Sequence, residues 1–229
     1  MRVFLATLDG LPPLGPELTG LMAPSRREKA LAFAKAPDRG RSILAGLLLR
    51  EVLGVTEDQD LWLEPAGKPR LAGSPLNFSL SHSGPYVALS VGFPPHGLDA
   101  QERRTRPIPA GLARWALSPA EIAALSENPD PDTFVRAWTM KEAYAKATGR
   151  GLSAGLNAFS VLPLESGPRP VEGREVFFHL MALPGAAMSL ASLTPSLPPL
   201  VMNLNARISR LIAHGRGETG PAPIYKVRR

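Results

Sequence analysis

Residues 132–147 constrain the fold most, because their apolar side chains recur at the spacing of a helix. At about 100° per residue, one narrow stripe collects Phe134, Trp138 and Ala145. Glu142 and Lys146 lie on one flank of this stripe, and Lys141 lies on the other. An ordinary surface helix keeps its charges opposite its apolar face. The layout therefore places an acid and cations at the mouth of a crevice, as phosphate and metal chemistry require.

A plainer interpretation is open for these residues. Glu142 and Lys146 stand four positions apart, which is the spacing of an ordinary ion pair on a core helix. Phe134 and Trp138 are most simply anchors in the core.

A second segment, residues 86–101, reads as two strands joined by a turn. The apolar run 86–93 predicts a buried strand, residues 94–97 predict a turn, and a new strand begins at Leu98. Asp99 and Gln101 then face the same side of that strand. Glu102 points to the opposite side.

Together, the two segments resemble the signature of the 4′-phosphopantetheinyl transferases of the surfactin-synthetase-activating type, G-x-D-x-E followed by W-x-x-K-E-x-x-x-K. The second motif is complete at 138–146, whereas the first has Gln101 where the family has an acid. Shorter matches in the family's order are Arg26-Arg27-Glu28-Lys29, Asp38 to Leu44, Gly67-Lys68-Pro69, Asn77 to Gly84 and Gly149-Arg150-Gly151-Leu152. The resemblance covers about residues 1–162.

The resemblance implies a fold and a reaction. The family fold is α+β, a pseudo-twofold tandem of two similar halves with a small antiparallel sheet in each and the active site in the cleft between them. The family transfers 4′-phosphopantetheine from coenzyme A to a serine of an acyl or peptidyl carrier protein and releases adenosine 3′,5′-bisphosphate. Such chemistry depends mainly on positioning, charge neutralisation and a base for the incoming hydroxyl.

The roles of the motif residues follow from the resemblance. Asp99 and Glu142 are expected to hold Mg²⁺, or Mn²⁺ in its place, and Gln101 contacts the ion through water. Glu142 is the candidate base, directly or through a metal-bound water, and Lys146 stabilises or protonates the leaving phosphate. For Lys141, a structural role and a role facing the carrier are both open.

Coenzyme A is expected to contact a set of basic and polar residues. By family matching, the set is Arg26, Lys29, Arg41, Lys68, Ser81, His82 and Lys146. Arginine suits bidentate phosphate binding and lysine supplies a point charge. Plainer interpretations are a solvated helix face for Arg26 and Lys29, and a histidine satisfied by backbone for His82.

The chain repeats helices followed by strands. In the first half, the expected elements are a strand at 2–9, a helix opening on a Ser25/Glu28 capping box, a helix from Asp38 to Gly54, and strands at 61–64, 78–81 and 86–93. In the second half, they are helices at 110–117, 118–125 (Ser118/Glu121 capping box) and 132–147, and strands at 158–162, 176–181 and 188–193. The proline-rich runs 163–170 and 195–199 are expected to be loops or edges. We divide the chain into halves 1–105 and 106–204 and a basic irregular tail, 205–229, that covers the rim of the cleft.

The net charge and the residue composition limit the kinds of molecule that the chain can bind. The net charge of +6 favours polyanions, and the acidic carrier proteins of the family fit it, but no zinc-finger spacing or helix-turn-helix pattern supports nucleic-acid binding as the main role. The chain has no cysteine, so any metal must be held by oxygen or histidine ligands. No apolar stretch reaches about 18 residues, and we expect a cytoplasmic monomer without membrane contact.

Two other functions use some of the same residues. A hydrolase built on Ser81, His82 and Asp99 is disfavoured, because neighbours on a strand point to opposite faces and no G-x-S-x-G elbow is present. The alternative is a non-catalytic relative that binds coenzyme A and carrier proteins, which Gln101 motivates.

Overall fold

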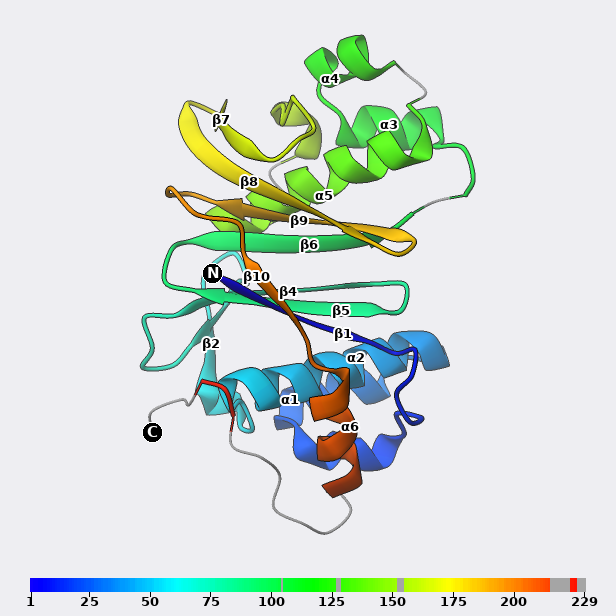
Figure 1. Ribbon diagram of the computed structural model, residues 1–229, viewed down its shortest axis with the longest axis vertical. Coiled ribbons are helices and arrows are strands. Elements are labelled where there is room, and N and C mark those ends of the chain that lie inside the picture. The colour runs from blue at the N-terminus through cyan, green and yellow to red at the C-terminus, as the bar shows by residue number, and fades with distance from the viewer. Residues whose placement is uncertain (104, 127–128, 152–154, 215–222, 226–229) are drawn as a thin grey trace.

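The computed structural model describes residues 1–103, 105–126, 129–151, 155–214 and 223–225. Two four-stranded sheets lie next to each other, and a long helix packs on each of them (Figure 1). The predicted α+β class is therefore confirmed.

The first sheet contains strands from both ends of the chain. Its order is β10-β1-β5-β4, with bounds β1 Arg2–Thr7, β4 Asn77–Ser83, β5 Tyr86–Gly92 and β10 Leu200–Asn203. β5 pairs antiparallel with β1 and β4, whereas β10 pairs parallel with β1. The sequence did not predict β10, whose residues are all exposed and lack a buried face.

Helices cover one face of this sheet. They are the 3₁₀ turn η1 Pro16–Leu21, α1 Pro24–Leu31, α2 Ala36–Leu48 and the π-helical turn η2 Leu49–Leu53, followed by the 3₁₀ turn η3 Asp58–Asp60. Gly54, at φ +73°, ends the long helix as predicted. The capping box at Ser25 is wrong, because the Ser25 hydroxyl and backbone N–H both donate to Asp58 instead.

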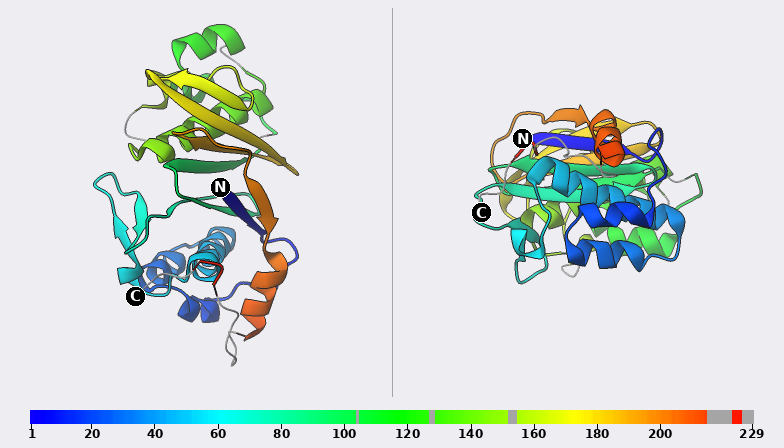
Figure 2. Two further views of the ribbon diagram at one scale, coloured as in Figure 1. Left: turned by 60° about the vertical axis from the view of Figure 1, so that its left-hand side comes forward. Right: turned by 90° about the horizontal axis from the view of Figure 1, so that it is seen from below.

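A two-stranded hairpin stands beside this half. It consists of β2 Leu61–Leu63 and β3 Pro69–Leu71, and residues 64–68, which include Gly67 and Lys68, form its tip. Figure 2 shows the hairpin on the side of the molecule opposite β10.

The second sheet has the order β6-β9-β8-β7 and is antiparallel throughout. Its strands are β6 His96–Glu102, β7 Gly167–Val171, β8 Arg174–Leu183 and β9 Ala186–Ser192. β7 overlaps the run 163–170 that was expected to be loop or edge, and its prolines are tolerated because it is the edge strand.

The strand predicted at 158–162 is wrong. Residues Leu156–Ala158 form the 3₁₀ turn η5, and the following segment bonds to side chains instead of a neighbouring strand. The Phe159 carbonyl accepts from Lys141, and the Val161 N–H donates to Glu121.

Three helices of this half agree with the sequence. They are α3 Ala110–Ala116, α4 Pro119–Leu125 and α5 Pro131–Thr148. The Ser118/Glu121 capping box of α4 is formed. α5 begins on the side chain of Asp130, which accepts from the N–H groups of Asp132 and Thr133, and ends at Gly149 in the left-handed conformation.

The prediction of an irregular tail is wrong over its first part. α6, Asn205–His214, buries Ile208, Leu211 and Ile212 in the core of the first half. Residues 223–225 also return to this half, where the N–H groups of Ile224 and Tyr225 donate to carbonyls of η2. This segment therefore packs on η2, whereas the rim of the cleft was expected, and residues 215–222 and 226–229 lie outside the described residues.

The two halves share an apolar contact. Its buried members are Val3, Leu5, Ala88, Leu98, Ala100, Met188 and Leu190. By sheet membership, β6 belongs with the second half and β10 with the first. The boundaries at 105 and 204 stay predictions.

Candidate active site

A cavity of about 530 Å³ opens between the two halves. One wall comes from α1, α2, β4 and the hairpin, and the other comes from β6 and α5. The predicted site residues that line it are Arg26, Lys29, Lys68, Ser81, His82, Asp99, Gln101, Glu142 and Lys146. Arg41 is not among the lining residues.

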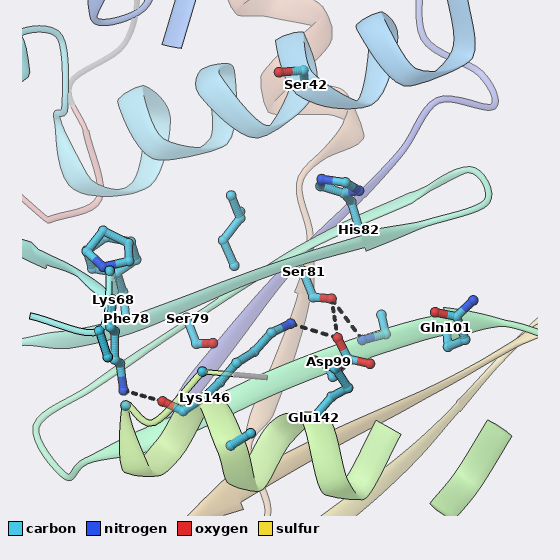
Figure 3. Close-up of a pocket in the computed structure, with 18 of the residues that line it drawn as sticks. Ser42, Lys68, Phe78, Ser79, Ser81, His82, Asp99, Gln101, Glu142 and Lys146 are labelled. Atoms are coloured by element: carbon cyan, nitrogen blue, oxygen red, sulfur yellow. Dashed lines mark hydrogen bonds and ion pairs between the residues drawn. The ribbon is translucent and has the colours of Figure 1, made fainter. Parts of the chain in front are cut away.

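Gly97 explains how β6 and α5 come together. A Cβ at this position would lie 2.1 Å from the Ala143 carbonyl oxygen, so only glycine permits so close an approach. The expectation that Gly97 belongs to a turn is wrong, since it lies in β6. The close crossing brings Asp99 of β6 beside Glu142 and Lys146 of α5 (Figure 3).

Asp99 is held by one of its two carboxylate oxygens. Oδ1 accepts from the Ser81 hydroxyl at 2.7 Å and from the Lys146 ammonium at 2.7 Å. Oδ2 is buried and has no hydrogen-bond partner among the described residues. Lys146 thus pairs with Asp99 on another element, and the plainer interpretation of a pair with Glu142 is wrong.

Glu142 is 8% exposed, and its pKa is raised to about 7. Burial is the main cause, the negative charge of Asp99 adds to it, and the positive charge of Lys146 opposes it. A carboxyl group with such a pKa can accept a proton near neutral pH.

Cations surround His82 on the opposite wall, and Lys146 faces it from α5. Burial lowers the pKa of His82, and the charges of Arg41, Lys146, Lys29 and Arg26 lower it further. Arg26 has a buried Nε without a partner in the described part of the chain. This concentration of positive charge favours an anion in the cavity.

Lys68 and Arg41 already have protein partners. The Lys68 ammonium donates to the carbonyls of His96 at 3.0 Å and Lys146 at 2.7 Å, so it ties the hairpin to the end of α5. Burial lowers its pKa to about 8, and its third proton remains for a ligand. Arg41 pairs with Asp38 and donates to the Gly84 carbonyl.

Lys141 has a structural role. It is fully buried, pairs with buried Glu121 at 2.7 Å and donates to the Leu156 and Phe159 carbonyls. Its ammonium also lies 4.5 Å from the centre of the Phe159 ring. Of the two roles left open by the sequence, the structure supports the structural one.

Gln101 and Glu102 point as predicted. Gln101 lines the cavity, whereas the Glu102 carboxyl lies beside Gly84. The described residues contain no group of three or more His, Cys, Asp or Glu that could hold a metal. Any cation here would have two carboxylates at most.

Sequence reasoning missed two features of this site. Trp138 lines the cavity and also packs against Trp115 and Phe134, so it is more than a core anchor. Ser79 also lines the cavity, and the alternation of serines along 79–83 was the signal that marked it.

Comparison with known proteins identifies the family. Residues 95–186 match the model of the 4′-phosphopantetheinyl transferase superfamily. The 4′-phosphopantetheinyl transferase ffp of Bacillus subtilis is 31% identical over 216 residues, which cover 86% of this chain and 95% of that protein. The chain belongs to the 4′-phosphopantetheinyl transferase superfamily.

Two further relatives agree. The 4′-phosphopantetheinyl transferase Sfp of Bacillus subtilis strain 168 is 31% identical over 160 residues, 66% of this chain and 70% of that protein. HetI of Nostoc is 37% identical over 117 residues, 49% of each chain. As a member of this family, the chain is a 4′-phosphopantetheinyl transferase; the family uses coenzyme A and acts on carrier proteins. None of the described helices has the length and apolar character needed to cross a membrane.

Proposed function

We propose that this enzyme transfers 4′-phosphopantetheine from coenzyme A to a serine hydroxyl of an acidic acyl or peptidyl carrier protein, releases adenosine 3′,5′-bisphosphate and depends on Mg²⁺. The observation that carries the proposal is the meeting of Asp99 and Glu142 beside Lys146, facing the cations of the opposite wall. The net charge of +6 suits an acidic partner.

The residues present fit a divalent cation. Asp99 has a buried oxygen without a partner in the described chain, and its charge contributes to the raised pKa of Glu142. Both features are those of a carboxylate pair whose negative charge Lys146 alone does not balance. Asp99 and Glu142 would hold Mg²⁺, or Mn²⁺ in its place, and Gln101, which lines the same cavity, would act through water. When bound, the ion would neutralise charge on the pyrophosphate.

The chain's own residues supply the remaining chemistry. Glu142 takes the proton of the carrier serine, whose oxygen forms a bond to the phosphorus next to pantetheine. The bond from that phosphorus to the bridging oxygen breaks, and Lys146 stabilises or protonates the oxygen that leaves with adenosine bisphosphate.

Coenzyme A is proposed to lie along the cationic wall. Arg26, Lys29 and His82 line the cavity there, and Lys68 has one proton left for a phosphate oxygen. Ser81 and Arg41 already donate hydrogen bonds to Asp99 and to the Gly84 carbonyl. Either residue would therefore have to share its donor groups to make its predicted contact with coenzyme A. Because both walls come from one chain, we propose a monomer, acting in the cytoplasm.

The test is modification of a carrier protein. The enzyme is incubated with coenzyme A, MgCl₂ and several apo carriers, and mass spectrometry detects the phosphopantetheine adduct and adenosine bisphosphate. Glu142→Gln should lower the rate by roughly 10²–10⁴-fold, as loss of a general base does. The control, Glu175→Gln, changes an exposed acid on β8 and should keep the rate. No adduct with any carrier would favour the non-catalytic binding protein.

A further inference from the structure

Three serines join the two sheets where β4 lies beside β6. Ser79, Ser81 and Ser83 alternate along β4, and their hydroxyls accept the backbone N–H groups of Leu98, Ala100 and Glu102 at 3.0, 3.1 and 2.9 Å. We call these residues the serine seam. The seam satisfies N–H groups of β6 with side-chain oxygens of β4.

The Ser79 and Ser81 hydroxyls donate their single proton to different acceptors. Each hydroxyl that accepts an N–H still has one proton to donate. The Ser79 hydroxyl directs its proton to the Leu98 carbonyl at a long 3.5 Å. The Ser81 hydroxyl donates to Asp99 Oδ1 at 2.7 Å. Ser81 is thus the member of the seam whose hydroxyl is bonded to Asp99 (Figure 3).

This bond fixes the orientation of Asp99. Because the Ala100 N–H donates to the Ser81 oxygen, the serine proton is directed away from Ala100 and toward the carboxylate. Lys146 holds the same oxygen at 2.7 Å, so Oδ1 has two donors and Oδ2 is left without one in the described chain. A hydrogen bond to a charged acceptor is about twice as strong as one between neutral groups.

We propose that Ser81 is a positioning residue that turns Asp99 so that Oδ2 is the oxygen available to the divalent cation. The inference rests on the proposed function, because it assumes that the cation binds at Asp99 and Glu142. It assigns Ser81 a role different from direct contact with coenzyme A, since its one proton cannot serve the carboxylate and a phosphate together.

The seam supplies its own matched controls. Ser79→Ala and Ser83→Ala each remove an acceptor for a β6 N–H, as Ser81→Ala does, but within the described residues neither hydroxyl is bonded to a carboxylate. Mg²⁺ affinity is measured by calorimetry with saturating coenzyme A. Loss of a hydrogen-bond partner of a metal ligand typically costs 10–100-fold in affinity. We expect Ser81→Ala to weaken Mg²⁺ binding by about tenfold or more, and each control variant to weaken it by about twofold or less.

A second measurement separates positioning from direct binding. Coenzyme A affinity is determined in EDTA, where the metal makes no contribution. Ser81→Ala should keep the wild-type affinity within about twofold, whereas His82→Ala should lower it. Weakened coenzyme A binding in EDTA by Ser81→Ala, or a metal affinity equal to that of Ser79→Ala, would overturn the proposal.

A variant that does not fold and a failure of the proposed function can each be distinguished from a failure of the positioning role. If Ser81→Ala does not fold, Ser81→Cys retains the approximate volume with only a weak S–H donor, and it is compared with Ser79→Cys for the same difference in Mg²⁺ affinity. If the wild-type enzyme modifies no carrier and binds no Mg²⁺, the proposed function itself fails. A wild type that does both, with a Ser81 variant indistinguishable from its controls, refutes the positioning role alone.

Discussion

Lys141 gives the sharpest test of how the catalytic helix is supported. The change is Lys141→Ala, which removes the ammonium bound to Glu121, Leu156 and Phe159. Both charged side chains are 0% exposed, so the carboxylate of Glu121 would stay buried and unpaired. Breaking such a pair from one side costs about 3–5 kcal/mol. A domain is stable by only about 5–15 kcal/mol, so the loss is a large fraction of the total.

The assay is urea unfolding at pH 7. Two variants act as controls. Glu121→Gln with Lys141→Met removes both charges and should recover most of the lost stability, because no buried charge is left unpaired. Arg136→Ala removes an exposed ion pair with Asp132 on the same helix and should cost about 1 kcal/mol or less.

A different result would refute this account. If the free energy of unfolding of Lys141→Ala is within about 1 kcal/mol of the wild-type value, and the variant instead raises KM for the carrier, then Lys141 faces the carrier. If the double variant is as unstable as the single one, the packing of the lysine stem matters more than its charge.

The remaining predictions concern the cavity. Gln101→Glu adds a charge near the proposed cation and should lower the Mg²⁺ concentration for half-maximal rate; an unchanged requirement in a Mg²⁺ titration would mean that residue 101 does not face the ion. His82→Ala should weaken coenzyme A binding, measured by calorimetry. Lys68→Ala should weaken it by an amount that shrinks at high salt, and it should also lower Tm because its ammonium ties two carbonyls. In EDTA, stability should fall by up to about 3 kcal/mol as pH rises from 4.5 to about 7, since burial and Asp99 make native Glu142 hold a proton that the unfolded chain has lost. Glu142→Gln should remove that fall. If the wild type and Glu142→Gln show the same change in the free energy of unfolding between pH 5 and pH 8, the reasoning is refuted.

Local signals predicted the helices of the second half well. Ser118 and Glu121 form the predicted capping box, and α5 spans Pro131–Thr148 against the predicted 132–147, because the interactions that set these helices lie within a few residues of each other. Ser25 carried a similar signal, yet its hydroxyl bonds to Asp58, which is distant in sequence. Tertiary partners therefore override a local pattern where a competing acceptor is near.

The sequence identified the residues of the site better than the contacts between them. The motif brought Asp99, Glu142 and Lys146 to one place, but spacing favoured an ion pair within the helix and the structure pairs Lys146 with Asp99. Only the crossing at Gly97 decides this, because it moves β6 within reach of the helix. The partner of Lys141 was invisible for the same reason, since Glu121 lies on another helix.

The pairing of β1 with β10 sets an order of events during protein synthesis. β1 leaves the ribosome about 200 residues before β10, with which it pairs on one side, and α6 then covers the core around Phe4. At about 5–20 residues per second, that interval is on the order of ten seconds or more. Throughout it, apolar surface that α6 will cover stays open to water and to other nascent chains. Expression of the first 105 residues alone should therefore give an aggregating fragment, and the enzyme's yield in cells should depend on chaperones that hold this surface until the last strand arrives.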